Sequence, residues 1–315
     1  MENLAVLGAG LMGHSIALTA AWAGIDVALQ GVDDADIGRA EQGIREKLAV
    51  LQEHGLIREQ EIEQICGRIH TTVSIEEAIR GATFVIEAIP EQLELKIAFF
   101  RRLDELCAPE VLLASNTSGL SPTAIASQMK RPQRMVVTHF WNPAHLIPLV
   151  EVVRGEQTDD PTVKRALDFL KMMNKRPIEV KKDILGSVGN RIQYAIFREA
   201  QYILEQGVAS MEDIDAAVTY SLGRRLPVTG PFMTADMGGL DVFHSISSYL
   251  FADLSKADGS YEPMSRLAES GNYGLKTGKG FYDWDQQTSQ AMNKRREKEL
   301  IHFLKQDLAG ESEQD

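Results

Sequence analysis

The sequence predicts an α/β protein in which a doubly wound, mainly parallel sheet is followed by an all-α domain. Three observations predict it. A glycine-rich turn follows the first apolar run, strand and helix patterns alternate up to about residue 182, and helical patterns dominate from Leu185 onward. We therefore expect a dinucleotide-binding domain over residues 1–184. A helical domain is expected over residues 185–315.

The first element is a strand over 3–7, which runs into the turn Gly8-Ala-Gly10-Leu-Met-Gly13. In such a turn the first glycine permits the sharp bend, the second lets backbone approach a pyrophosphate, and the third lets a helix pack on the strand. A small-residue helix over 14–23 and a strand over 26–30 complete a βαβ unit. This pattern is typical of Rossmann-type domains. The residues expected at the cofactor phosphates are Gly8, Gly10, Leu11, Met12 and Gly13.

The next segment, residues 40–69, has a charged amphipathic pattern broken near Gly55, which predicts a helical hairpin insertion. The hairpin is either a solvated insertion or a wall of the substrate cleft. Short apolar runs then predict further buried strands, over 83–88, 111–114, 134–138 and 149–153. Ligands of such sheets bind at the carboxyl ends of the strands, so the polar residues there are the candidates for chemistry.

The second domain is predicted from helical patterns, of which residues 190–204 give an example. Two turn-rich segments, 223–231 and 274–282, interrupt the helices. A further helix is expected over 291–308, and the acidic end 311–315 is expected to fray.

Composition limits the partners. The 315-residue chain has a net charge of -12 and a pI near 5.2, without a stripe of Lys or Arg, which argues against nucleic acid. Cys66 and Cys107 lack the spacing of a zinc site or a disulfide framework, so no metal is expected. Glu2 and Asp26 argue against a signal peptide or membrane span at the N-terminus. We expect a soluble, cytoplasmic protein that has no membrane partner.

The candidates for catalysis lie near the strand ends, in the segments 115–118 and 138–143. Glu151 stands inside an apolar strand, and an unpaired buried carboxylate is costly, so it needs a partner. His139 is the natural one, because a carboxylate fixes the imidazole tautomer and stabilises its protonated form. Alone, each residue would be read as a core histidine or a structural ion-pair member. The cluster predicts a general base.

Taken in order, the motifs resemble those of the 3-hydroxyacyl-CoA dehydrogenase family, from residue 2 to about 284. The motifs that carry the resemblance are Gly8-Ala-Gly10-Leu-Met-Gly13, Glu87-Ala-Ile-Pro-Glu91, Ser115-Asn-Thr-Ser118, His139-Phe-Trp-Asn-Pro143, Leu149-Val-Glu151, Asn190-Arg191 and Lys276-Thr-Gly-Lys-Gly-Phe281. The resemblance implies an NAD-dependent oxidoreductase of fatty acid metabolism. It also implies a short-chain, 3-hydroxybutyryl-CoA-like substrate of (S) configuration and a homodimer joined through the helical domains.

The resemblance also implies roles. His139 takes the hydroxyl proton and Glu151 orients it, while Ser118 bonds the reacting oxygen and Asn190 holds the substrate from the second domain. Taken alone, Ser118 and Asn190 would equally be helix or turn caps. The remaining expected contacts are Glu91, Lys96 and Asn116 for the cofactor, and Asn142 and Arg225 for the substrate.

Cofactor choice depends on the end of the second strand. Where the family places an acidic residue for the ribose hydroxyls, this chain has Gly31. Asp33 or Asp34 would substitute after a shift of the loop. Otherwise the missing carboxylate removes the repulsion against a 2′-phosphate, and Arg39 offers it a positive charge. NAD is the expected cofactor and NADP the alternative.

Two residues bear on the substrate. Acyl-CoA members of the family usually carry a lysine at the position of Pro148, and proline removes both the charge and a backbone donor. The segment around Arg225 resembles relatives that oxidise free hydroxy acids, such as gulonate and carnitine dehydrogenases and lambda-crystallin, and an arginine can clamp a carboxylate. A 3-hydroxyacyl-CoA is the first expectation and a free 3-hydroxy acid the alternative. A non-catalytic lambda-crystallin-like protein is a further alternative.

Overall fold

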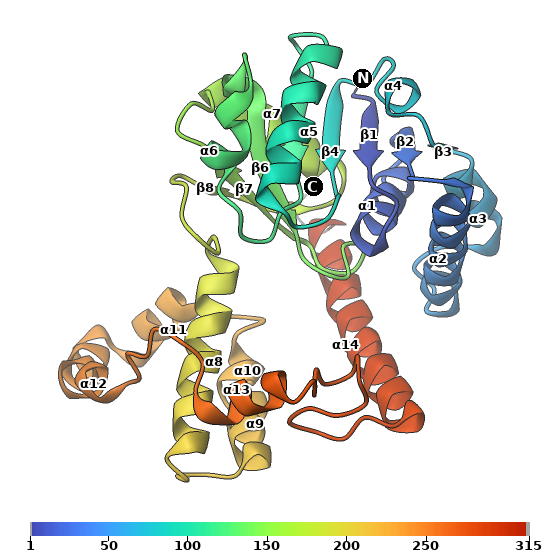
Figure 1. Cartoon of the computed structure of the whole chain (residues 1–315). Helices are drawn as coiled ribbons and strands as arrows, with labels where there is room; N and C mark the ends of the chain where they lie inside the picture. Colours follow the sequence, from blue (N-terminus) through green and yellow to red (C-terminus); the bar gives the residue numbers. More distant parts are fainter. Residues whose placement is uncertain (1, 313–315) are drawn as a thin grey trace. The chain divides into compact units, whose positions relative to one another are not determined.

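The computed structural model describes residues 2–312, and the chain divides into two compact units (Figure 1). The first unit contains the chain up to Gly189 together with the chain from Arg296 onward, and the second is Asn190–Arg295.

The first unit is built on one eight-stranded sheet in the order β3-β2-β1-β4-β5-β6-β7-β8. Its strands are β1 (Leu4–Leu7), β2 (Val27–Gln30), β3 (Ile69–Thr72), β4 (Phe84–Glu87), β5 (Leu112–Ser115), β6 (Met135–Phe140), β7 (Leu149–Arg154) and β8 (Arg176–Val180). Neighbouring strands are parallel except β6 and β7, which pair antiparallel. The strand order reverses between β1 and β4, so the carboxyl ends of these two strands form the crevice where such folds bind dinucleotides.

The helices of the first unit begin where the sequence supplies caps. Asp33, Ser74, Ser121 and Asp159 each accept a backbone N–H from the first turn of the helix that begins there. The helices are α1 (Leu11–Trp22), α2 (Asp34–Glu53), α3 (Glu59–Cys66), α4 (Ile75–Ala78), α5 (Leu93–Leu106), α6 (Pro122–Ile125) and α7 (Asp160–Met172). Two short 3-10 turns, Ala126–Gln128 and Pro132–Arg134, lie between α6 and β6.

The predicted mainly parallel sheet and the helical hairpin are confirmed, the hairpin as α2 and α3. Two details differ. The sequence pattern gives no bounds for β3, α4 or β8, because short elements with little burial give no clear period. His139, predicted to follow its strand, lies inside β6, because pairing with β7 extends that strand to Phe140.

The core of the first unit follows the alternation of strand side chains. Leu4 and Val6 of β1 belong to one buried cluster, and Ala5 and Leu7 belong to a second cluster. Successive strand residues point to opposite faces, so the sheet buries both of them. Helix α1 is buried along most of its length, which explains its small residues.

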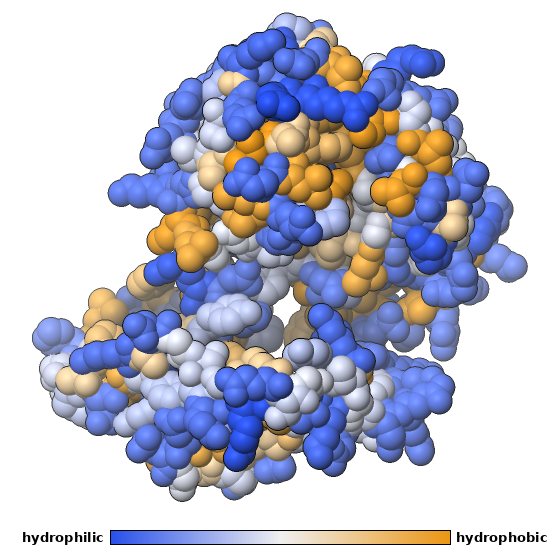
Figure 2. Space-filling model, viewed as in Figure 1, coloured by the Kyte–Doolittle hydropathy of each residue, from blue (hydrophilic) through white to orange (hydrophobic). Residues whose placement is uncertain are grey.

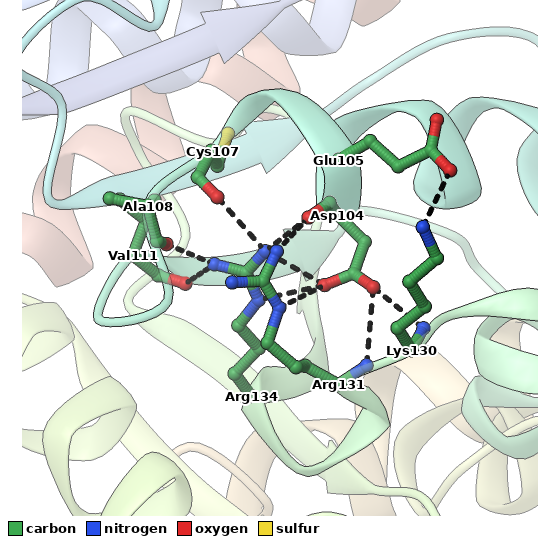
Figure 3. Close-up of polar contacts among 8 residues, drawn as sticks. All are labelled: Asp104, Glu105, Cys107, Ala108, Val111, Lys130, Arg131 and Arg134. Atoms are coloured by element: carbon green, nitrogen blue, oxygen red, sulfur yellow. Dashed lines mark hydrogen bonds and ion pairs between the residues drawn. The ribbon is translucent and has the colours of Figure 1, made fainter.

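A buried ion-pair network holds the C-terminal end of α5 (Figure 3). The Asp104 carboxylate is 2.8 Å from Arg134 Nη2 and accepts the backbone N–H groups of Lys130 and Arg131. Arg134 also donates to the carbonyl oxygens of Cys107, Ala108 and Val111. The network joins α5 to the segment that leads into β6.

The second unit is helical, as predicted. Its helices are α8 (Gly189–Glu205), α9 (Met211–Tyr220), α10 (Leu222–Arg225), α11 (Pro231–Gly238), α12 (Leu240–Asp253) and α13 (Glu262–Glu269). Helices α9 to α13 contain no buried residue, and several large apolar side chains on α11 and α12 are exposed. Figure 2 shows apolar atoms among the polar ones over these two helices, at the lower left of the view.

Helix α14 (Gln286–Ser312) belongs to both units (Figure 1, red). Its residues from Arg296 belong to the first unit, where Ile301 and Leu304 are buried in the same cluster as β1. The helix begins before the predicted range of 291–308, and the predicted frayed end lies outside the described residues from 313 onward. Over residues 2–312, no helix combines the length and the apolar composition that a membrane span requires.

Candidate active site

The glycine-rich turn joins β1 to α1, and its three glycines face different surroundings. A Cβ on Gly8, where φ is +106°, would lie 2.6 Å from the carbonyl oxygen of Ala88, and one on Gly13 would lie 1.7 Å from that of Gly8. A Cβ on Gly10 would meet nothing within 4 Å. The first and third glycines are therefore required by packing, whereas Gly10 leaves exposed backbone beside the N-terminus of α1. No side chain caps that N-terminus, so its N–H groups suit a pyrophosphate.

Leu11 and Met12 complete the turn. Leu11 is exposed, and Met12 is partly buried against the core.

The end of β2 places acidic residues where a ribose would lie. Asp33 caps α2 through a 2.7 Å bond from Asp36 N, and Asp36 in turn accepts the backbone N–H of Val32 at 3.2 Å. Arg39 is 3.2 Å from Asp36 and is therefore paired within this turn. Gly31 packs against Ile37. The carboxylates of Asp34 and Asp36 thus place negative charge in the first turn of α2, directly after β2.

A buried ion pair lies at the carboxyl end of β4. Glu87 is fully buried, and its Oε1 accepts from Lys96 Nζ at 2.5 Å and from Ile89 N at 2.7 Å. Its Oε2 accepts from Ser115 Oγ at 2.6 Å. Lys96 is only 1% exposed, so its charge is held beside Glu87 and under the surface of the crevice.

Glu91 connects this pair to the loop after β5. Its Oε2 is 3.5 Å from Lys96 Nζ, and its Oε1 accepts from Thr117 Oγ1 at 2.5 Å and from Ser118 N at 3.0 Å. The Ser118 side chain is exposed. Glu91 thus joins Lys96 through an ion pair and Ser118 through a hydrogen bond, although the three residues come from two separate loops and a helix.

His139 and Glu151 face each other across the antiparallel pair of β6 and β7. His139 Nδ1 lies 2.8 Å from Glu151 Oε2, and both side chains are buried. An ionised carboxylate only accepts hydrogen bonds, so the proton of this contact lies on Nδ1 and Nε2 keeps its lone pair. The sequence prediction that these two residues pair is met by this geometry.

Glu151 is also held on its other oxygen. Its Oε1 accepts the backbone N–H groups of Val188 at 2.8 Å and Gly189 at 3.0 Å, at the start of α8. Burial acts to raise the pKa of the Glu151 carboxyl, but the bonds from His139 and these N–H groups outweigh it and hold the pKa below its usual value. The carboxylate therefore stays ionised at neutral pH.

The asparagines of the site occupy the neighbouring loops. Asn116 follows β5, and its Oδ1 accepts the backbone N–H of Phe140 at 2.9 Å, so it ties the β5 loop to the end of β6. Asn142 follows β6, is exposed, and precedes the cis bond to Pro143.

The last two predicted site residues belong to the second unit. Asn190 is the second residue of α8 and is partly buried, and Arg225 is the last residue of α10 and is exposed. Asn190 directly follows the Gly189 N–H that Glu151 binds.

Sequence reasoning gives no role to Glu87, Thr117 or Trp141. The signal for Glu87 is a charged residue at the end of a run of buried apolar residues, where a partner is required. Thr117 and Trp141 stand within the matched motifs, but their contacts depend on loops that meet only in the fold. Among residues 2–312, no group of three or more His, Cys, Asp or Glu side chains is placed to hold a metal.

Comparison with known proteins identifies the family. The model for the NAD-binding domain of 3-hydroxyacyl-CoA dehydrogenase matches residues 3–184, and that for the C-terminal domain matches residues 186–284. A probable 3-hydroxybutyryl-CoA dehydrogenase from Bacillus subtilis is 38% identical over 292 residues, which cover 92% of this chain and 99% of the relative.

A further relative and a solved structure share the name of one enzyme. A 5-formyl-3-hydroxy-2-methylpyridine 4-carboxylate 5-dehydrogenase from Mesorhizobium japonicum is 34% identical over 301 residues, which cover 96% of each chain. A solved structure of such a dehydrogenase, described as an NAD+-dependent dismutase, has a TM-score of 0.89 at 33% identity and covers 96% of this chain and 97% of its own. The chain therefore belongs to the 3-hydroxyacyl-CoA dehydrogenase family, whose members are NAD-dependent oxidoreductases acting on CH–OH groups, and its first domain is an NAD-binding domain.

Proposed function

We propose that this chain oxidises a substrate hydroxyl group, with His139 as the general base and Glu151 as the carboxylate that orients it. The observation that carries the proposal is the 2.8 Å contact between His139 Nδ1 and Glu151 Oε2 inside the sheet. This contact leaves Nε2 free of the proton, so Nε2 takes the hydroxyl proton while the carbon–hydrogen bond breaks. NAD, held at the glycine-rich turn by the backbone of Gly8, Gly10 and Gly13, would supply the hydride acceptor for the same carbon.

The positive charge that His139 gains is offset by Glu151, which remains ionised. In the reverse direction the protonated imidazole returns the proton to the carbonyl oxygen. Ser118 and Asn190 are proposed to donate to this oxygen, where negative charge develops, and such a donor is commonly worth about 3 kcal/mol.

The proposed cofactor is NAD in preference to NADP. The open backbone at Gly10 admits the pyrophosphate, and Asp33, Asp34 and Asp36 surround the expected ribose position with negative charge. Arg39 contacts Asp36 at 3.2 Å, so the positive charge that a 2′-phosphate would need is partly offset. We expect Glu91, with Lys96 behind it, to bind the nicotinamide half, and Asn116 to fix the loop beside it.

The first candidate substrate is a short-chain (S)-3-hydroxyacyl-CoA. It is supported by the family models over residues 3–284 and by the relative named as a probable 3-hydroxybutyryl-CoA dehydrogenase.

The second candidate is a free acid, and a specific observation favours it. The alignment with the Mesorhizobium enzyme, whose name specifies a pyridine carboxylate, spans 96% of this chain and so extends into α14, which both family models leave out. Pro148 and Arg225 support the same assignment, because the first removes a charge and the second supplies one for a carboxylate.

A comparison of initial rates separates the two candidates. NADH oxidation would be followed with acetoacetyl-CoA, free acetoacetate and 5-formyl-3-hydroxy-2-methylpyridine 4-carboxylate, the last also in the direction of NAD reduction. Turnover of the thioester alone would establish the acyl-CoA substrate. Turnover confined to free acids would establish the second candidate, and Arg225→Met should then raise KM for the acid by about tenfold or more.

The base itself is tested by His139→Gln. This variant should lower kcat by about 10³-fold while the affinity for NADH stays the same, since the side chain lies outside the glycine-rich turn. NADH binding would be measured by fluorescence titration. Unchanged turnover would remove His139 from the mechanism.

We also propose that the protein is a homodimer joined through its second unit. The support is the row of exposed apolar side chains on α11 and α12, which a partner copy would cover.

A further inference from the structure

Trp141 contacts the His139–Glu151 pair, although its place in the motif assigns it no task. It follows β6 directly, and its indole Nε1 donates to Glu151 Oε2 at 3.3 Å. This is the same oxygen that His139 Nδ1 approaches at 2.8 Å. The His139 and Trp141 rings also pack together, with centroids 5.5 Å apart and planes tilted by 46°.

These contacts complete the surroundings of a fully buried carboxylate. Each Glu151 oxygen takes two donors: His139 and Trp141 on Oε2, and the backbone N–H groups of Val188 and Gly189 on Oε1. A carboxylate offers about four lone-pair sites, so all of them are used. A buried charge that is satisfied in this way has one orientation, because any rotation would leave a donor or an oxygen without a partner.

The packing of Trp141 is equally specific. A Cβ on Gly189 would lie 2.4 Å from Trp141 Cζ2 and 3.2 Å from Cε2, so the indole packs directly on the backbone whose N–H group binds Glu151. Trp141 therefore touches three parts of one arrangement: the base, the carboxylate, and the first residue of α8.

We propose that Trp141 is a positioning residue for the general base, which acts through Glu151 by fixing the carboxylate and dispersing its charge. The inference rests on the proposed function, because it assumes that His139 removes the substrate proton. The indole supplies a donor that phenylalanine, of similar shape, would lack.

Loss of the indole N–H should shift the pH dependence of the reaction in one direction. Removal of the indole N–H concentrates negative charge on Oε2, which strengthens its bond to the protonated imidazole. A base must be unprotonated to act, so the acid limb of the kcat/KM profile for oxidation moves to higher pH. A residue that only fills space would lower the rate by the same factor at every pH.

The test is Trp141→Phe, with Trp284→Phe of the second unit as the matched control. In the first variant, the acid limb of kcat/KM should move up by about 0.5 pH unit, kcat at neutral pH should fall severalfold, and KM for NAD should stay the same. The control should retain the wild-type profile. An unshifted acid limb in Trp141→Phe would overturn the proposal, whatever happens to the rate.

Gly189→Ala provides a second variant that leaves the indole itself intact. The added methyl group must displace Trp141, so the acid limb should shift in the same direction. Gly38→Ala is its control, since a Cβ on Gly38 meets nothing within 4 Å. A folded Gly189→Ala protein with a wild-type profile would contradict the proposed packing of Trp141 on Gly189.

The roles of His139 and Trp141 are tested separately. If His139→Gln retains full turnover, the proposed base is wrong. If His139→Gln is inactive but Trp141→Phe keeps the wild-type pH profile, only the role of Trp141 is wrong.

Discussion

The two units of this chain differ in where they place their apolar and charged groups. The first buries both faces of its sheet and several charged pairs, among them Glu87 with Lys96 and Asp104 with Arg134. The second leaves large apolar side chains exposed, such as Phe232 at 89% and Phe251 at 66%, and buries almost none. The difference teaches that the first unit completes its own core, whereas the second leaves the apolar faces of its helices exposed.

The largest effect on stability is expected from breaking a buried ion pair of the first unit. Asp104→Ala leaves Arg134 charged and buried without its carboxylate, so the free energy of unfolding should fall by about 4 kcal/mol. Urea denaturation would measure it. The control is Asp168→Ala, which removes an exposed pair with Lys164 and should change the free energy of unfolding far less. Equal effects of the two changes would contradict the comparison.

The buried histidine of the β6–β7 connection makes the first unit sensitive to acid. Burial, together with the charges of Lys47, Lys175 and His14, lowers the pKa of His145 to about 3 from an ordinary value of 6.5. The unfolded chain therefore binds a proton that the folded chain does not between these values, and stability is lost as the pH falls below about 6.5.

The effect should reach about 2.5 kcal/mol between pH 6.5 and 4.5. His145→Gln removes the titrating group, so its unfolding free energy should decline less over this interval than that of the wild type. The matched change at exposed His70 should leave the wild-type slope. Parallel slopes for wild type and His145→Gln would show that His145 is not held neutral by the fold.

Changes on the second unit should act on association and have the smallest effect on the first unit. Phe232→Glu combined with Phe251→Glu should weaken self-association at least about 100-fold, while the unfolding free energy of the first unit changes by less than about 0.5 kcal/mol. Analytical ultracentrifugation and urea denaturation would measure the two quantities. Met172→Glu, an exposed apolar position on α7, is the control. A wild-type association constant in the double variant would place the dimer contact elsewhere.

The sequence predicts most of the first unit because its signals are local. Each glycine of the turn, each apolar strand and the hairpin around Gly55 can be inferred from a pattern within about ten residues, and buried Glu151 demands a partner. The predicted contact between His139 and Glu151 needs only the register of two adjacent strands.

The contacts that the sequence does not predict depend on how separate elements pack against one another. Glu87 contacts Lys96 and Ser115 because α5 begins, and β5 ends, beside the end of β4. Trp141 packs on Gly189, which lies 48 positions later in the chain, because α8 begins beside the end of β6. No period in either segment encodes such a contact. The exposed apolar side chains of the second unit are likewise recognised only once the fold is known.

The division of α14 between the units governs the order in which the protein matures at the ribosome. Ile301 and Leu304 belong to the same buried cluster as Leu4 and Val6, so residues that follow the helical unit in the chain complete a core that contains β1. N-terminal domains generally fold during synthesis, before the later domains of the chain. Here the part of the first unit's core that Ile301 and Leu304 cover is completed only after the entire helical unit has been synthesised.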